Sequence, residues 1–417
     1  MKPKWNKLDN AAKIYPASST KTDTHVFRFS CELYESVDPE ILQHALIETI
    51  KIFPVYQYIL RRGLFWYYLE STSLIPVVRP EYKPPCNELY DRNQKTLLYE
   101  VTYFGNIINL EVYHVLTDGT GAMNFLKILV TKYLSEIHSL PEPEVDYDAS
   151  HMQMADDSFR RYYNKNIRKP KNKTKYFKAY RLKGQKFSEN RIKIIRGLVS
   201  VSKMLKISRE YHSTLTTFLS ACLIQAINEE ITAMAKKHPV VLAIPVNLRN
   251  YFKSESARNF FSIVYTGTMY CDEDILFEDI VNKVNSDFTR ELTLENMTGH
   301  LNSLYSIERN FFVRIAPLFV KNLALKIAYE RAAAKSTATL SNVGIIKVPQ
   351  EIVPYIRSFD VCTGTNRLQV CICSYLDNLS INFTTPLMNS DIQRRFYRIL
   401  TGLGVEVELT ANQIADE

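Results

Sequence analysis

Apolar and polar residues follow two periods along this chain, and together the two periods predict a mixture of strands and helices. Alternation with a period of two is typical of half-buried strands, whereas apolar residues three and four positions apart are typical of amphipathic helices. The first pattern predicts strands over residues 25–34, 55–60, 64–69, 74–78, 96–104 and 107–114, and later over 197–201, 240–246, 260–271, 338–343, 356–361, 368–375, 379–384 and 405–409. The second predicts helices over residues 38–53, 122–137, 202–210, 214–230, 276–292 and 391–403, with further helix up to about residue 334. Strands and helices follow in a similar order in both halves, which favours two lobes that each mix sheet and helix.

The stretch from Leu110 to Ala122 combines a strand, a histidine, a glycine-rich turn and the start of a helix. A strand-to-helix corner exposes side chains, and the N–H groups at the start of the helix point toward the space beside it. Histidine is the side chain best suited to move a proton near neutral pH. His114-x-x-x-Asp118-Gly119 is therefore a candidate catalytic element. The alternative is structural, because Asp118 could serve only as the N-cap of the following helix.

Two segments depart from these regular patterns. The opening stretch from Trp5 to Ser18 predicts an irregular segment that runs along a cleft, or else a terminal arm packed by Trp5. The stretch from Phe311 to Ala334 is the most apolar helical one, but Arg314, Pro317, Lys321, Lys326 and Glu330 interrupt it. These interruptions argue against a transmembrane span. The pattern favours a helix buried in the core, with an amphipathic helix that touches lipid as the alternative.

Composition places the chain among soluble globular proteins. A length of 417 residues with 46% hydrophobic and 23% charged residues predicts two domains or one large two-lobed unit. The net charge of +8 suits anionic small molecules or membrane surfaces and does not by itself imply nucleic acid. Seven cysteines without a Cys-x-x-Cys pair, and a start without an apolar signal core, predict reduced thiols and a cytoplasmic location. We expect no metal, because the other seven histidines lack acidic or cysteine neighbours at metal-ligand spacing.

Residues 150–196 differ in composition from the rest, because lysine and arginine crowd this segment and tyrosine is interleaved among them. Such a mixture resembles a nucleic-acid-binding patch. No recognised nucleic-acid module frames it, so we favour a solvated linker between two lobes and do not expect a nucleic-acid partner. A third interpretation is electrostatic attraction of a phosphorylated cofactor or of an anionic membrane surface.

Several motifs taken together resemble the CoA-dependent acyltransferase superfamily, which includes chloramphenicol acetyltransferase, alcohol acetyltransferases and the condensation domains of peptide synthetases. His114-x-x-x-Asp118-Gly119 resembles the active-site signature of this group. The further matching segments are Asp38–Leu46 with Phe53-Pro54, Pro245–Arg249, Arg258–Phe261 and Thr339–Gly344, and they follow in the expected order. Tyr113 stands where condensation domains usually carry a second histidine, and the Asp-Phe-Gly-Trp motif of the plant enzymes is absent. Both departures favour the bacterial or fungal alcohol-acetyltransferase-like branch.

The resemblance implies an α/β (α+β) fold of two chloramphenicol-acetyltransferase-like lobes, each a mixed β-sheet with flanking helices, with an active-site tunnel between them. We therefore assign residues 1–149 to an N-terminal lobe that carries His114, residues 150–196 to the basic linker, and residues 197–417 to a C-terminal lobe. Acyl-CoA would enter the tunnel from one mouth and the acceptor from the other. No permanently bound cofactor is expected, and acyl-CoA, acetyl-CoA in the first place, is a co-substrate.

The resemblance also implies a role for each motif residue. His114 would act as the general base, and Asp118 would fix the loop by an ion pair, for which Arg249 is the candidate partner. The oxyanion would be stabilised by N–H groups around Gly119, or by Ser341 or Asn342 from the facing lobe. Ser341 and Asn342 could equally be turn residues that precede Gly344.

The function expected on these grounds is transfer of an acyl group from a thioester to an alcohol or amine. An alternative is a stand-alone condensation-type enzyme that takes its acyl group from an acyl carrier protein. A further alternative is a non-catalytic scaffold that binds acyl groups or a partner. Peripheral contact with a membrane is left open for any of the three.

Overall fold

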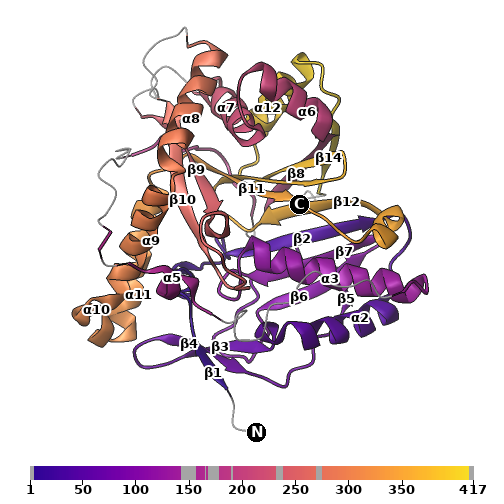
Figure 1. Ribbon diagram of the computed structural model, residues 1–417, viewed down its shortest axis with the longest axis vertical. Coiled ribbons are helices and arrows are strands. Elements are labelled where there is room, and N and C mark those ends of the chain that lie inside the picture. The colour runs from indigo at the N-terminus through magenta and orange to yellow at the C-terminus, as the bar shows by residue number, and fades with distance from the viewer. Residues whose placement is uncertain are drawn as a thin grey trace.

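A computed structural model describes residues 4–141, 156–164, 166–167, 178–188, 191–231, 238–268 and 275–412. The chain forms two large sheets with helices around them, and a small third sheet lies near the N-terminus (Figure 1). Parts of the basic linker expected over residues 150–196, namely 150–155, 165, 168–177 and 189–190, lie outside the described residues. So do the end of the strand expected over 260–271 and Cys271.

The first sheet has five strands in the order β12-β2-β7-β6-β5. Its strands are β2 (Val26–Leu33), β5 (Arg79–Pro80), β6 (Tyr99–Phe104), β7 (Ile107–Tyr113) and β12 (Ile356–Thr363). All pairs are antiparallel except β5 with β6. Helices α2 (Pro39–Ile52) and α3 (Gly119–Ile137) lie side by side against this sheet (Figure 1). Asp38 caps α2 as expected, because its carboxylate accepts the N–H groups of Glu40 and Ile41.

The second sheet has seven strands in the order β10-β9-β11-β13-β14-β8-β15. They are β8 (Lys193–Ser200), β9 (Val240–Asn247), β10 (Phe261–Thr268), β11 (Ala338–Ile345), β13 (Leu368–Tyr375), β14 (Asn378–Thr385) and β15 (Glu408–Ala411). The sheet is mixed, because β11 runs parallel to both β13 and β9. The helices around it at the top of Figure 1 are α6 (Val201–Glu210), α7 (Leu215–Asn228), α8 (Phe277–Glu291) and α12 (Asp391–Gly402).

The two sheets adjoin at β12, which follows β11 in the sequence but pairs with β2 in the first sheet. Arg196 of β8 bridges the sheets there, donating to Glu32 of β2 at 3.1 Å and to Ser358 of β12 at 2.7 Å. Strand β8 begins at Lys193, inside the range assigned to the linker. The sequence ranges of the two proposed lobes therefore do not coincide with the two sheets.

The opening segment is more regular than expected. Trp5–Lys7 form strand β1, which pairs with β4 (Tyr67–Ser71) in a three-stranded sheet completed by β3 (Tyr58–Arg62). A 3₁₀ turn (Ala12–Ile14) and the short helix α1 (Tyr15–Ser18) follow. The expectation of an irregular start was therefore wrong.

The strand expected over residues 74–78 is also absent from the described residues. Gln43 of α2 provides the reason, because its side chain donates to the carbonyl of Pro76 and accepts from the N–H of Val78. These backbone groups thus pair with a side chain and not with a neighbouring strand.

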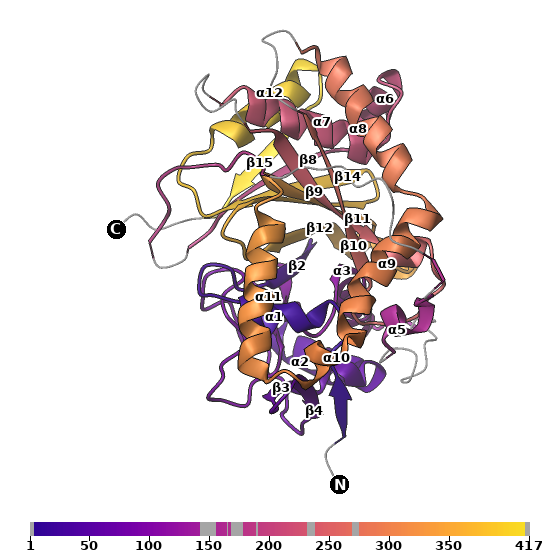
Figure 2. The same ribbon diagram turned by 90° about the vertical axis from the view of Figure 1, so that its left-hand side faces the viewer.

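Helices α9 (Leu294–Arg309), α10 (Phe311–Ile315) and α11 (Leu318–Ala333) lie along one side of the molecule, where α11 runs beside α1 (Figure 2). The expectation that the stretch from Phe311 to Ala334 is buried in the core was wrong, because most of its apolar side chains are exposed. None of the helices within the described residues is both long enough and apolar enough to span a bilayer. The six described cysteines are buried free thiols, with the sulfur atoms of Cys86 and Cys362 lying 3.8 Å apart.

Candidate active site

His114 lies directly after β7, at the corner where the chain leaves the first sheet and turns into α3. The helix begins at Gly119, three residues before the predicted start. Asp118 is its N-cap and accepts the N–H of Gly121 at 3.1 Å. The backbone N–H of His114 donates to the carbonyl of His25 at 2.9 Å, which ties the corner to the start of β2. The strand–turn–helix setting predicted for the motif is therefore present.

Aromatic rings surround the imidazole of His114 on several sides. Tyr15 of α1 stacks on it with a centroid distance of 4.9 Å and an interplanar angle of 18°. Phe27 of β2 lies at 4.6 Å and Phe261 of β10 at 6.0 Å. The rings come from both large sheets and from the N-terminal segment, so His114 lies where these parts of the chain meet. Even so, His114 remains partly exposed to solvent.

Asn259, just before β10, holds both the ring and the backbone of His114. Its amide nitrogen donates to the carbonyl of His114 at 2.9 Å and to the carboxylate of Asp9 at 3.2 Å. Since both partners are acceptors, the amide oxygen faces Nδ1 of His114, at 3.2 Å. Nδ1 therefore carries the proton, and Nε2 keeps the lone pair that a general base needs.

The environment keeps this imidazole neutral. Burial lowers the pKa of His114 from 6.5 to about 4, although the hydrogen bond with Asn259 and the charge of Asp118 act in the opposite direction. Near neutral pH the ring is therefore uncharged and can accept a proton. The arrangement can position a weak, correctly oriented base at a junction of the two halves.

His25, which is buried, adjoins this site. His25 has a positive φ of 53°, and its ring contacts Tyr15 and Tyr329 of α11 at centroid distances of 5.1 Å each. Burial lowers the pKa of His25 to about 4 and raises that of its neighbour Asp23 to about 6. Tyr329 donates to Asp23 at 2.8 Å. These contacts tie α11 to the backbone that supports His114.

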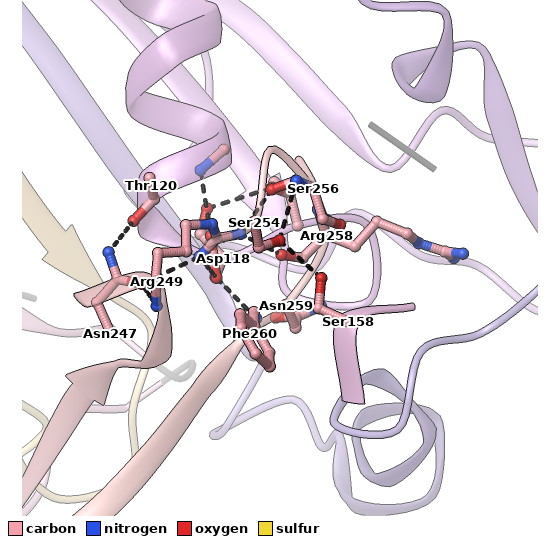
Figure 3. A network of polar contacts seen from close by, with 12 residues as sticks. Asp118, Thr120, Ser158, Asn247, Arg249, Ser254, Ser256, Arg258, Asn259 and Phe260 are labelled. Carbon is pink, nitrogen blue, oxygen red and sulfur yellow. Dashed lines mark hydrogen bonds and ion pairs between the residues drawn. The ribbon is translucent and has the colours of Figure 1, made fainter. Parts of the chain in front are cut away.

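Three hydrogen bonds from the protein hold the carboxylate of Asp118 in place. Besides capping α3, it accepts from the guanidinium of Arg249 at 2.7 Å and from the N–H of Phe260 at 2.9 Å. Figure 3 shows Arg249 and Phe260 beside this carboxylate, with Asn247 next to Arg249 and Thr120. Arg249 also donates to the carbonyls of Ser256 and Arg258 at 2.8 and 2.6 Å. The network joins the start of α3, which packs on the first sheet, to the loop between β9 and β10 of the second sheet. We call these two sheets with their helices the two halves of the molecule.

The two glycines of the turn have different structural roles. A Cβ at Gly121 would lie 2.0 Å from the hydroxyl of Thr117 and 2.3 Å from the carbonyl of Ala257. A Cβ at Gly119 would meet only the ring of Phe29, at 3.8 Å. Close packing of α3 against the second half therefore requires glycine at 121, whereas nothing in the local packing requires it at 119.

Within the described residues no hydrogen bond joins Ser341 or Asn342 to His114, whose ring lies beside Tyr15, Phe27, Asn259 and Phe261. The amide of Asn342 donates to Thr216 at 2.9 Å, and its oxygen accepts the N–H of Gly344 at 2.9 Å. Gly344 has a positive φ of 94°. Ser341 and Asn342 thus lie within β11 and not in a turn, and the side chain of Asn342 supports the bulge between Asn342 and Gly344 and links this strand to α7.

Sequence reasoning gave no role to Asn259, Tyr15 and Asp9. Asn259 lies in a motif that carried the family resemblance, but it is 145 residues from His114 in the sequence. Tyr15 and Asp9 belong to the opening segment that was expected to run along a cleft. That expectation was the one signal pointing to them, and it named neither residue.

No family model matches the chain, and a search of curated proteins finds no match. Solved structures do match over nearly the whole length. The trichothecene 15-O-acetyltransferase TRI3 from Fusarium sporotrichioides aligns with 96% of this chain and 95% of its own, with a TM-score of 0.61 and 10% identity. TRI101 from F. graminearum, solved with coenzyme A and deoxynivalenol, aligns with 97% of this chain and 99% of its own, with a TM-score of 0.62 and 12% identity.

A third match is the first condensation domain of the CDA synthetase, which covers 96% of both chains with a TM-score of 0.62 and 13% identity. At such low identity the likeness establishes the fold and leaves the activity open. The chain therefore has the two-lobed α/β fold that the acetyltransferase and condensation-domain structures share.

Proposed function

We propose that this protein is an acyltransferase that moves an acyl group from a thioester to a hydroxyl or amine acceptor, with His114 as the general base. One observation carries the proposal. The imidazole of His114 is neutral, the residue is partly exposed, and Asn259 engages Nδ1 while Nε2 keeps its lone pair. The fold shared with acetyltransferase and condensation-domain structures supports this class of reaction.

The proposed reaction needs one proton carrier. A hydroxyl is a poor nucleophile until its proton is removed, and Nε2 of His114 takes that proton as the oxygen attacks the thioester carbon. The tetrahedral intermediate then collapses, the carbon–sulfur bond breaks, and the imidazolium returns the proton to the departing thiolate. Asp118 keeps the corner in place through Arg249 and takes no part in proton transfer.

The developing oxyanion needs hydrogen-bond donors. N–H groups at the start of α3 around Gly119 are the candidates that lie on the same corner as His114. Ser341 remains a candidate from β11, as predicted, and Asn342 is the weaker of the two because its amide nitrogen donates to Thr216.

The donor we propose is acyl-CoA, with acetyl as the first group to test and an alcohol as the first acceptor. The ligand of TRI101 supports coenzyme A as the carrier, and a tunnel between the lobes would bring both substrates to His114. The test mixes the purified protein with acetyl-CoA and a panel of alcohols and amines, and follows release of free thiol. We expect release that depends on an acceptor and falls by about 10²–10⁴-fold in His114→Ala.

The likeness to a condensation domain favours one second candidate, in which an acyl carrier protein brings the thioester. Both donors end in the same thiol arm, so the same assay separates them when an acylated carrier protein replaces acetyl-CoA. Release from the carrier alone would favour the condensation-type enzyme. If neither donor reacts, or if His114→Ala reacts as fast as the wild type, the protein is not an acyltransferase of this kind.

A further inference from the structure

Helix α11 and the segment before it present apolar side chains to solvent. The exposed large apolar residues of this region are Phe311, Ile315, Phe319, Val320, Leu323 and Ile327, which we call the α11 surface. Phe319, Leu323 and Ile327 are four residues apart and so lie on one face of the helix. The side chains of Phe319 and Leu323 are 67% and 63% exposed. A face of this kind would normally be buried against the core of a globular protein.

The opposite face of α11 is held against the protein by polar contacts. The ammonium group of Lys321 donates to the carbonyls of Phe65 and Arg314 and lies 3.6 Å from the ring centre of Trp66. Asn322 donates to the hydroxyl of Tyr67 at 3.2 Å. Tyr329, about two turns further on, donates to Asp23. These contacts fix the rotation of the helix, so the outward direction of the apolar face is built into the fold.

The β3–β4 hairpin extends the apolar surface. The N–H of Leu318 donates to the carbonyl of Leu64 at 3.1 Å, which places the tip of this hairpin beside the start of α11. Leu64 and Phe65 at that tip are both exposed. Two elements far apart in the sequence therefore contribute to one apolar area, larger than the scattered single residues that are normal on a surface.

The charge around the α11 surface indicates what covers it. Residues 311–335 contain five basic residues and only one acidic residue, Glu330. Four of these basic residues are exposed, namely Arg314, Lys326, Arg331 and Lys335. A second copy of this chain would bring the same positive charges face to face. Apolar side chains bordered by lysine and arginine are instead typical of helices that lie in the interface of an anionic bilayer.

We infer that the α11 surface docks this protein onto a membrane that contains anionic lipids. Phe319, Leu323 and Ile327 enter the boundary between headgroups and acyl chains, while the surrounding lysines and arginines contact lipid phosphates. The inference rests on the geometry of α11 and not on the proposed acyl transfer.

The test measures flotation of the full chain with two kinds of vesicle. One kind contains phosphatidylcholine alone, and the other contains equal parts of phosphatidylcholine and phosphatidylglycerol. We expect at least about tenfold stronger binding to the anionic vesicles, since each basic residue near the surface contributes about fivefold. Raising the salt concentration to about 0.5 M should weaken that binding, because ions screen the attraction. The double substitution Phe319→Ser and Leu323→Ser should lower it by at least about tenfold.

The matched control is Phe104→Ser with Leu376→Ser. These residues are 66% and 62% exposed, as much as the tested pair, but they lie on β6 and on the β13–β14 turn. The control should bind vesicles like the wild type. Absence of binding to the anionic vesicles, or equal losses in both double variants, would overturn the inference. The inference would also be overturned if sedimentation showed that the wild type is a dimer, that the α11 double variant is a monomer, and that vesicles do not change the dimer.

Discussion

Asn259 and His114 are 145 residues apart in the sequence, yet the asparagine amide contacts the histidine at both its ring and its backbone carbonyl. The carboxylate of Asp9 completes the arrangement by accepting the second proton of the amide nitrogen. Asp9 is itself fully buried and accepts the N–H of Ala12 at 2.7 Å. An acidic residue of the opening segment thus orients an amide of the second half, which in turn fixes the tautomer of the imidazole.

Removing the Asn259 amide should therefore impair catalysis more than binding. In Asn259→Ala, Nδ1 loses its acceptor and the ring is free to adopt the unproductive tautomer. We expect kcat/KM for acyl transfer to fall by about 10–100-fold through kcat, with KM little changed, as loss of one oriented hydrogen bond would produce. The control is Asn302→Ala, which removes another buried asparagine, one that donates to the carbonyl of Asn164 away from His114. Equal losses in the two variants would assign Asn259 a merely structural role.

The pH dependence of the reaction follows from the pKa of His114. Because burial lowers this pKa to about 4, the active neutral form is lost only as the pH falls through about 4. The kcat/KM of the wild type should therefore rise with pH through that region and stay level up to about pH 8, since it reports groups of the free enzyme. In Asn259→Asp a carboxylate would face Nδ1, favour the imidazolium and move the acid limb upward. An acid limb near 6.5 in the wild type, or a downward shift in the variant, would contradict this account.

The contributions of Asp118 and Arg249 to the free energy of unfolding should depend on each other. Replacing either residue alone leaves the other charge without its partner in a largely buried place, so Asp118→Asn and Arg249→Gln should each cost about 2–4 kcal/mol of unfolding free energy. The double variant should cost less than the sum, with a coupling of about 1–3 kcal/mol in urea titrations. The comparison pair is Asp391 with Arg394, an ion pair at the surface that should couple by less than about 1 kcal/mol. A coupling in the Asp118–Arg249 pair no larger than in the surface pair would show that the two residues act independently.

The parts of the site that could be predicted are those that local sequence determines. Strand β7, the cap at Asp118 and helix α3 follow one another without a break, so alternation, capping preference and helical spacing are enough to predict them. The same holds for Asp38 at the start of α2. Asn259 and Tyr15 could not be assigned in this way, because neither lies near His114 in the sequence and each reaches it only once the two halves have assembled.

For helix α11 the sequence led to a wrong prediction, that of burial in the core. Its composition is apolar enough to predict burial, and hydropathy alone carries no information about which face a helix turns inward. That choice depends on Tyr67, Asp23 and the carbonyl of Phe65, which come from distant segments and hold the polar side of α11. Strand β12 could not be placed from the sequence for a related reason, because its alternating pattern fits either sheet.

Gly121 offers a direct test of how tightly the two halves meet at the motif. A methyl group there would lie within 2.3 Å of the backbone carbonyl of Ala257, and that carbonyl also accepts a hydrogen bond from Thr117. The Ala257 carbonyl cannot move away from the added methyl group without displacing the loop that holds Asn259. We therefore expect Gly121→Ala to cost about 1–3 kcal/mol of unfolding free energy or more, measured by urea denaturation.

The same substitution should reduce acyl transfer, because displacement of the Ala257 backbone also shifts Asn259 two residues away. Gly402→Ala is the control, since a Cβ at this position in α12 would meet no atom within 4 Å. It should leave both stability and activity close to those of the wild type. If Gly121→Ala were equally harmless, the contact between α3 and the β9–β10 loop would have to be looser than the structure shows. The inter-half hydrogen bonds to His114 would then be too weak to fix its tautomer.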